Sequence, residues 1–160
     1  MKPLVVVALH NIRSAHNVGS IFRTADAAGC KKLYLCGVTP GPFDRFGRPN
    51  PKIAKIALGA EQYLPSEHKT STVKLLQSLR RDGYEIIAIE QHSRAQSIYK
   101  VRLSRARHKR YVLVLGEEVH GLSPTILRHA DRIVEIPMRG KKESLNVSVA
   151  FGVAVFQLLR

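Results

Sequence analysis

The sequence predicts an α/β protein with a mostly parallel sheet flanked by helices. Apolar runs of strand length alternate with segments of helical periodicity along most of the chain, which is typical of βα units. The chain has 160 residues, enough for one domain to bury its own core, and it shows no linker or internal repeat. We therefore expect a single domain over residues 1–160.

The N-terminal part of the chain contains the first predicted βα unit. A Val-rich run over residues 4–9 predicts a buried strand, and residues 17–28 carry apolar side chains at helical spacing. We expect Asn17 to cap this helix and Gly29 to end it. Residues 32–36 predict the second strand.

The middle of the chain begins with a stretch rich in proline and glycine. Residues 37–51 contain four prolines and three glycines, which predict a long ordered loop of the kind that often carries function. Residues 72–82 then predict a helix with Ser71 as its cap, and residues 84–90 predict a strand.

The C-terminal part holds two more predicted strands, over residues 111–115 and 132–136. The first is almost wholly apolar, as a central parallel strand should be, and a helix is expected to start at Ser123 and Pro124. A final helix, opened by Ser144 or Asn146, is apolar nearly all round. Such a helix must be covered on more than one side.

The charge balance of the chain points to a polyanionic partner. Lys and Arg number 26 against 12 Asp and Glu, a formal net charge of +14, and nucleic acid is the leading candidate. Residues 91–116 hold much of this charge; a solvated basic face is the plainer interpretation. The candidate RNA-binding residues are Arg94, Lys100, Arg102, Arg105 and Arg107.

Several classes of protein are disfavoured by composition. Cys30 and Cys36 have no companion pair for a disulfide framework or a zinc site, so we expect free thiols in a reducing cytoplasm and no metal. No apolar stretch reaches the length of a membrane helix, and the basic run lacks an apolar face for membrane docking. Glycine-rich loops typical of Rossmann enzymes and NTPases are absent from the sequence.

Three segments carry residues suited to chemistry, each where a predicted strand ends or a helix begins. The first reads NVGSIFRTA from Asn17, and the long side chain of Arg23 can lean back toward an anion at the helix N-terminus. The second reads GEEVHGLS from Gly116, with Glu118 as a hydrogen-bond acceptor. The third reads IPMRGKKESLNVSVA from Ile136.

Taken together and in this order, the three segments resemble the motifs of the SpoU/TrmH family of the SPOUT superfamily. The resemblance spans nearly the whole chain and implies an α/β fold whose C-terminal part forms a deep trefoil knot. We expect no N-terminal RNA-binding extension of the kind that many relatives carry, so that substrate capture would fall on the catalytic domain or its dimer. The resemblance also implies a homodimer through the knot region.

The family resemblance further implies an activity: methylation of a ribose 2′-hydroxyl of tRNA or rRNA, with S-adenosylmethionine as donor. Residues that would bind the donor are Leu115, Gly116, Ile136, Met138, Gly140 and Leu145. The implied catalytic set is Asn17, Arg23, Glu118, Ser144 and Asn146.

The resemblance leaves the proton acceptor open. Arg23 is proposed as a general base in the family, but a guanidinium normally keeps its proton and is better suited to gripping a phosphate and stabilising the alkoxide. The proton would then leave through water, phosphate or one of His10, His16 and His120.

Two other functions remain open at this point. One is a non-catalytic RNA-binding or ribosome-binding knot protein, which should not bind S-adenosylmethionine. The other is a same-fold enzyme that methylates a base, against which the Ser-Leu-Asn sequence and Arg23 favour ribose as the acceptor.

Overall fold

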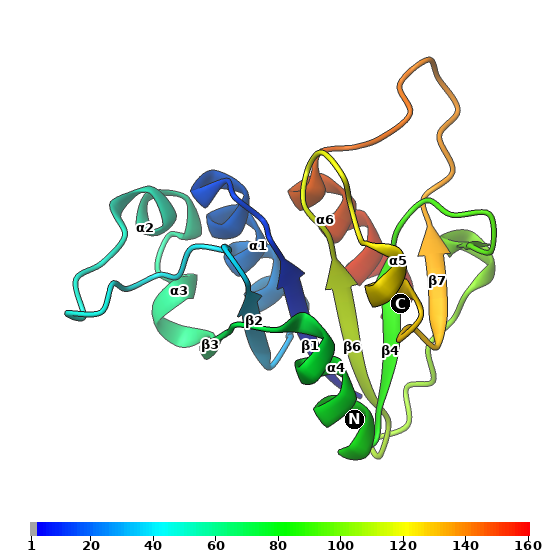
Figure 1. Cartoon of the computed structure of the whole chain (residues 1–160), viewed down its shortest axis with the longest axis horizontal. Coiled ribbons are helices and arrows are strands. Elements are labelled where there is room, and N and C mark those ends of the chain that lie inside the picture. The colour runs from blue at the N-terminus through cyan, green and yellow to red at the C-terminus, as the bar shows by residue number, and fades with distance from the viewer. Residues whose placement is uncertain (1–2) are drawn as a thin grey trace.

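Seven strands form one sheet in the order β3-β2-β1-β6-β4-β7-β5, and all six neighbouring pairs are parallel. The computed structural model describes residues 3–160 (Figure 1). The strands are β1 Leu4–His10, β2 Lys32–Cys36, β3 Ser66–Lys69, β4 Tyr84–Ile89, β5 Gln96–Ser97, β6 Arg110–Leu115 and β7 Arg132–Glu135.

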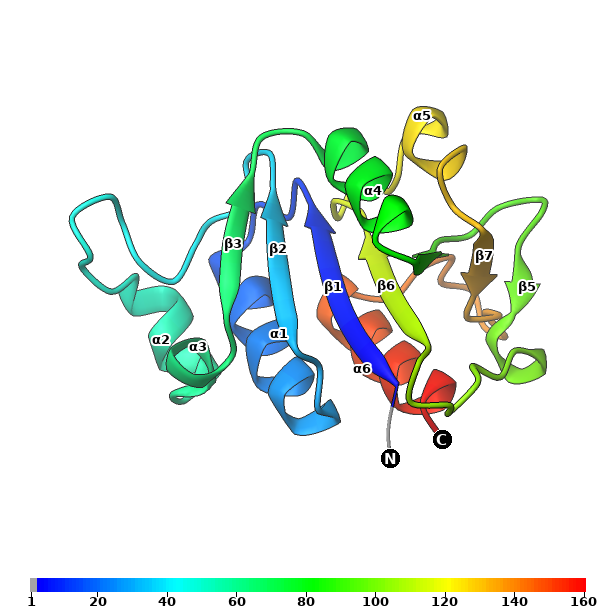
Figure 2. The same cartoon turned by 90° about the horizontal axis from the view of Figure 1, so that it is seen from below.

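The helices lie in two layers on opposite faces of the sheet (Figure 2). One face packs against α1, α2, α3 and α6, and the other packs against α4 and α5. The helices are α1 Ala15–Ala28, α2 Pro51–Ala57, α3 Ala60–Tyr63, α4 Thr72–Arg81, α5 Pro124–Leu127 and α6 Val147–Leu158, and a short 3₁₀ turn, η1, spans Ile98–Lys100.

The centre of the sheet is formed by β1, β6 and β4. In β6, Tyr111 through Leu115 are all buried, because helices cover both faces of this strand. The predicted strands over residues 4–9, 84–90 and 111–115 are therefore confirmed to within a residue at each end.

The start of α1 differs from the prediction. Ser14 is the N-cap, and its Oγ accepts a hydrogen bond from the amide of Asn17 at 3.2 Å. The expectation that Asn17 caps this helix was wrong, because the helix begins about one turn earlier. The side chain of Asn17 is thereby left available for a contact outside the helix. Gly29, with φ of 79°, ends the helix as expected.

Three elements between the long loop and α4 were not predicted: α2, α3 and β3. The strand β3 reads Ser-Glu-His-Lys and lies at the edge of the sheet, paired only with β2. Its polar residues suit an edge position, and the Glu67 carboxylate bridges Lys32 of β2, at 2.6 Å, and Lys69. A strand of this kind has no apolar periodicity for a sequence to reveal.

The final helix, α6, follows β7 and packs beside α1 on the same face of the sheet (Figure 1). Its side chains Phe151, Ala154 and Val155 are fully buried, whereas Val149 and Phe156 remain about half exposed. Asn146 is its N-cap. Within residues 3–160, no helix has both the length and the apolar character needed to cross a bilayer.

Candidate active site

The three chemistry-bearing segments meet at the carboxyl edge of the sheet. The first follows β1, the second follows β6 and the third follows β7, and the carboxyl ends of parallel strands lie at one edge. Strand β6 lies directly beside β1, so segments more than 90 residues apart in the sequence become neighbours.

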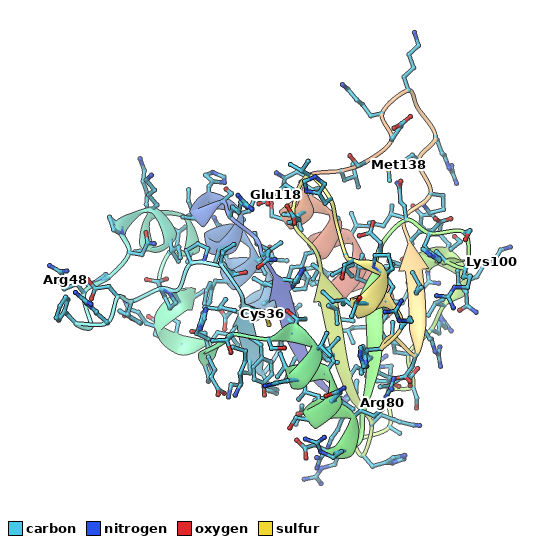
Figure 3. The ribbon with its side chains drawn as sticks, viewed as in Figure 1. Cys36, Arg48, Arg80, Lys100, Glu118 and Met138 are labelled. Atoms are coloured by element: carbon cyan, nitrogen blue, oxygen red, sulfur yellow. The ribbon has the colours of Figure 1, made fainter. Side chains whose placement is uncertain are left out.

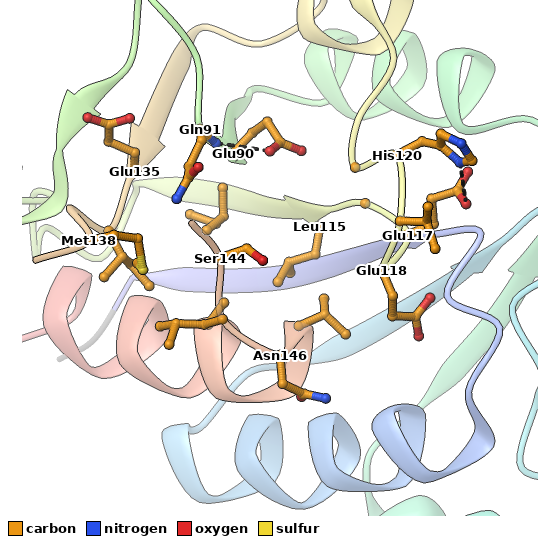
Figure 4. Close-up of a pocket in the computed structure, with 18 residues that line it drawn as sticks. Glu90, Gln91, Leu115, Glu117, Glu118, His120, Glu135, Met138, Ser144 and Asn146 are labelled. Atoms are coloured by element: carbon orange, nitrogen blue, oxygen red, sulfur yellow. Dashed lines mark hydrogen bonds and ion pairs between the residues drawn. The ribbon is translucent and has the colours of Figure 1, made fainter. Parts of the chain in front are cut away.

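A chain of side-chain hydrogen bonds joins the three segments. The Asn17 amide nitrogen donates to Glu118 Oε1 at 3.0 Å, and the Asn146 amide nitrogen donates to Asn17 Oδ1 at 3.1 Å. Asn17 is only 6% exposed, so its side chain is held in one orientation at the centre of this chain. Figure 4 shows Asn146 at the start of α6 and Glu118 on the loop after β6. The structure thus brings together one predicted catalytic residue from each motif.

Glu118 also secures the backbone at the start of α1. Its carboxylate accepts hydrogen bonds from the amides of Arg13 and Ser14 at 3.5 and 3.4 Å. Burial raises the pKa of the Glu118 carboxyl, but the hydrogen bonds from Asn17 and from backbone amides outweigh it, and the net pKa lies below its ordinary value. Glu118 is therefore ionised near neutral pH.

A cavity of about 450 Å³ opens beside this hydrogen-bonded chain. Glu118, Ser144 and Asn146 line it, together with five of the six residues predicted to bind the donor: Leu115, Gly116, Ile136, Met138 and Leu145. The sixth, Gly140, does not line the cavity and lies exposed in the loop between β7 and α6. Figure 4 shows the apolar side chain of Met138 and the polar side chain of Ser144 among those that line the cavity.

Close backbone packing shapes one wall of the cavity. A Cβ atom at Gly116 would lie 2.3 Å from the carbonyl carbon of Gly121, so no larger residue fits there without moving the loop. Gly121 has a φ of 63°, which favours glycine, and a Cβ there would meet the carboxylate of Glu90. The Gly-bounded loop of the second motif is therefore folded back on itself.

The cavity is acidic although the protein is strongly basic. Four carboxylates line it, those of Glu90, Glu117, Glu118 and Glu135, and no Lys or Arg does so among residues 3–160. Sequence reasoning missed Glu90 and Glu135. Each stands at the end of a predicted strand, at the edge where ligands bind in parallel sheets, and that position was the available signal.

Arg23 lies outside the cavity of its own chain. It is exposed on α1, six residues beyond Asn17, a distance of about 9 Å along a helix. It does not line the cavity, and it makes no ion pair within the described part of the chain. The structure therefore separates this predicted catalytic residue from Asn17, Glu118 and Asn146.

The three candidate histidines have different surroundings. His10 Nδ1 lies 2.8 Å from Thr72 Oγ1, and its Nε2 lies 3.3 Å from the side-chain amide of Asn11. Both of its nitrogens are thus engaged. Burial lowers the pKa of His10 by more than the negative charge of Glu117 raises it. His16 lies exposed outside the cavity, whereas His120 lines it and contacts Glu117 at 3.3 Å.

The basic segment does not form one patch beside the cavity. Arg94 lies in the loop between β4 and β5 and lines a smaller cavity of about 250 Å³ with Arg128 and Arg132, beside the amino end of β7. Arg102, Arg105 and Arg107 lie in the loop between η1 and β6, which leads into the amino end of β6. Lys100 ends the turn η1 at the side of the sheet (Figure 3).

The remaining reactive groups are inert or dispersed. Cys30 and Cys36 are buried free thiols, and burial raises their pKa values to about 12 and about 11. Among residues 3–160, no group of three or more His, Cys, Asp or Glu side chains is arranged to hold a metal ion.

Comparison with known families assigns the chain. The model of the SpoU rRNA Methylase family matches residues 4–156. The chain belongs to this family. The resemblance carried by the three motifs is thus confirmed, and so is the fold class, because the chain superimposes on solved SpoU and TrmH methyltransferases of the α/β-knot class.

This SpoU-family chain has curated relatives that are longer than itself. It is 31% identical over 158 residues to the 23S rRNA (guanosine-2′-O-)-methyltransferase RlmB of Pseudomonas putida, covering 99% of the chain and 59% of that relative. It is 34% identical to the RlmB of Ralstonia nicotianae, with the same two coverages. The chain therefore spans about three fifths of the length of these relatives.

Solved structures of SpoU-family proteins match nearly the whole chain. The AdoMet-bound rRNA methyltransferase of Sinorhizobium meliloti has a TM-score of 0.85 and 26% identity, over 98% of this chain and 56% of that one. The TrmH/SpoU tRNA modifying enzyme of A. aeolicus has a TM-score of 0.79 and 30% identity, over 98% of this chain and 74% of that one.

Proposed function

We propose that the protein transfers a methyl group from S-adenosylmethionine to a ribose 2′-hydroxyl of RNA, either ribosomal or transfer RNA. The observation that carries this proposal is the hydrogen-bonded chain of Glu118, Asn17 and Asn146 at the wall of the cavity. It joins one polar residue from each of the three family motifs beside a slot large enough for a cofactor. The relatives named as 23S rRNA guanosine-2′-O-methyltransferases support the same reaction.

The residues of the cavity fit S-adenosylmethionine by size and by charge. A volume of about 450 Å³ is in the range of small-molecule sites, and Leu115, Ile136 and Met138 offer apolar surface for an adenine ring. The donor carries a positive sulfonium, an amino group and one carboxylate, so its net charge is positive. Four lining carboxylates, with no Lys or Arg among the described lining residues, would favour such a molecule. When bound, it supplies an activated methyl group.

The chain's own residues would mainly position the reacting atoms. The reaction would form a bond from the ribose oxygen to the methyl carbon while the bond from that carbon to the donor's sulfur breaks and leaves its electron pair on sulfur. It therefore requires in-line orientation of the two reactants and an acceptor for the hydroxyl proton. We assign Ser144 and Asn146, which line the cavity, to orienting the ribose, and Glu118 to holding Asn17 and the start of α1 in place. Of the three candidate histidines, His120 lines the cavity and His10 and His16 do not, so His120 is the one placed to accept the hydroxyl proton.

A homodimer would cover the apolar side of α6. Val149, Val153 and Phe156 are 51%, 37% and 56% exposed, and their spacing puts them on one face of the helix. We propose that a second copy of the chain packs on this stripe. Val153→Asp should then lower the mass measured by light scattering to that of a monomer, whereas Val38→Asp, at an exposed valine in the loop after β2, should leave it unchanged.

The position of Arg23 suggests that a dimer shares its active sites. Arg23 lies outside its own chain's cavity, on the helix that packs beside α6. Mixing inactive Arg23→Ala and Asn146→Ala chains should restore roughly a quarter of wild-type activity if each site takes these residues from different chains. No recovery in verified mixed dimers would show that Arg23 acts within its own chain.

The test of the reaction uses labelled S-adenosylmethionine with unmodified ribosomal and transfer RNA. We expect nucleoside mass spectrometry to find a 2′-O-methyl nucleoside that is lost with Asn146→Ala and with Arg23→Ala. A base-methylated product would favour the same-fold base methyltransferase. Failure of the wild type to bind S-adenosylmethionine in calorimetry would favour the non-catalytic RNA-binding protein.

The reduced thiols of Cys30 and Cys36 fit a cytoplasmic site of action.

A further inference from the structure

The loop over residues 37–50 is held firmly at its base. It leaves β2 at the carboxyl edge of the sheet, the edge that holds the cavity, two strands away from β6. The buried Thr39 hydroxyl accepts a hydrogen bond from the amide of Ile12 at 3.1 Å and lies 2.8 Å from the Cys36 carbonyl. Asn11 accepts from the amide of Val38 at 3.1 Å. These contacts tie the loop to the segment that precedes α1.

The tip of this loop is also ordered by its own hydrogen bonds. The Asp44 carboxylate accepts from the amides of Phe46 and Arg48, at 2.8 and 3.0 Å, and from Arg48 Nε at 2.7 Å. These hydrogen bonds hold the pKa of the Asp44 carboxyl below its usual value, and the bond from the Arg48 amide lowers it most. Phe43 and Pro49 pair across the loop as an antiparallel bridge. The loop therefore projects from the body of the protein as a preformed hairpin (Figures 1 and 3).

The hairpin tip presents an exposed aromatic ring flanked by two cations. Phe46 is 67% exposed, and the guanidinium carbons of Arg45 and Arg48 lie 4.7 and 5.1 Å from the centre of its ring. We call these three side chains the Phe46 platform. The platform therefore offers an aromatic ring and two positive charges at one exposed point of the hairpin.

The geometry points to the Phe46 platform as a docking site for single-stranded RNA, at which an unpaired base stacks on Phe46 while both arginines attract phosphates. Aromatic rings and guanidinium planes are the surfaces on which splayed RNA bases stack, and stacking tolerates any base. This inference rests on the proposed function, since the RNA held there is the substrate that enters the cavity at the same edge. The platform would bind a nucleotide at a distance from the methylated ribose.

Binding of a short single-stranded oligouridylate, compared with a duplex of equal length, tests the inference. Phe46→Ala should weaken single-strand binding about fivefold or more, Phe46→Leu should weaken it similarly, and Phe46→Trp should retain it. Duplex binding should change little, because its bases are already stacked. Arg45→Gln should lower the salt slope by about one while leaving the Asp44 bonds intact.

The absence of tryptophan from the chain provides a second readout. Phe46→Trp introduces one fluorophore, which stacking by oligouridylate should quench. Tyr63→Trp is the matched control, because Tyr63 is 73% exposed but lies just before the amino end of β3, at the opposite edge of the sheet.

Each outcome has a defined meaning. If the wild type methylates RNA but Phe46→Ala binds single strands as tightly as the wild type, the platform is not an RNA site and the proposed function stands. If Phe46→Leu binds normally, or if tryptophan at position 46 is not quenched, stacking is ruled out. A wild type that neither binds nor methylates RNA removes both the inference and the proposed function.

Discussion

The cavity and the Phe46 platform have opposite character, although the hairpin that carries the platform leaves the sheet at the edge that holds the cavity. The cavity is lined by four carboxylates and no Lys or Arg among the described residues, whereas the platform exposes an aromatic ring between two arginines. A cationic methyl donor and an anionic RNA have matching requirements. The difference would let the protein separate its two proposed ligands by charge, although its formal net charge of +14 would by itself suggest only the second.

The largest expected effect comes from breaking the hydrogen-bonded chain at the cavity wall. Glu118→Gln preserves size but weakens the contacts to Asn17 and to the start of α1. Because misplacement of about 1 Å can cost about a hundredfold in rate, we expect kcat to fall by about that factor. Single-turnover kinetics measures this fall. An unchanged kcat in a folded variant would remove Glu118 from the catalytic machinery.

A smaller effect should follow from reducing the acidity of the cavity without touching that chain. Glu135→Gln removes one of the four carboxylates, and we expect S-adenosylmethionine to bind about fivefold more weakly, with RNA affinity unchanged. Calorimetry measures the donor affinity. Glu67→Gln, at a carboxylate on the distant edge strand β3, is the control and should bind the donor normally. Equal donor affinity in both variants would contradict a role for charge.

The basic segment offers a comparison between two of its loops. Arg94 lies three residues beyond Gln91, which lines the cavity, whereas Arg107 precedes the amino end of β6. We expect Arg94→Gln to lower RNA affinity by about threefold and the salt slope by about one, with a lesser change for Arg107→Gln. Binding titrations over a range of salt concentrations provide both quantities. A larger loss for Arg107 would place the RNA path along the amino end of β6.

The smallest expected effect concerns stability in acid. The pKa of Glu118 is depressed in the folded protein, so its contribution to stability is present above the pKa of the unfolded chain and is lost as pH falls through the lower folded value. For an exposed carboxylate this contribution should be under about 1 kcal/mol. Urea unfolding of wild type and Glu118→Gln should therefore differ slightly at neutral pH and converge in acid. A difference that grew in acid would contradict this sign.

The motifs allowed most of the site to be predicted, but not every residue in it. Glu118, Ser144 and Asn146, which the motifs singled out, line the cavity, and the strands that bring them there follow from runs of apolar residues. Asn17 was expected as a cap, because a polar residue before an apolar helical pattern looks the same whether it starts the helix or lies one turn inside it. Ser14 is the cap instead.

The sequence by itself determined the alternation of buried strands with helices, the helix caps at Ser71 and Ser123, and the basic charge. These depend on local periodicity, on single side chains or on composition. Only the tertiary structure decided which strand lies beside which. That order puts Glu118 against Asn17, leaves Arg23 outside the cavity, and divides Arg94 from Arg107, because contacts between distant segments depend on the packing of the whole sheet.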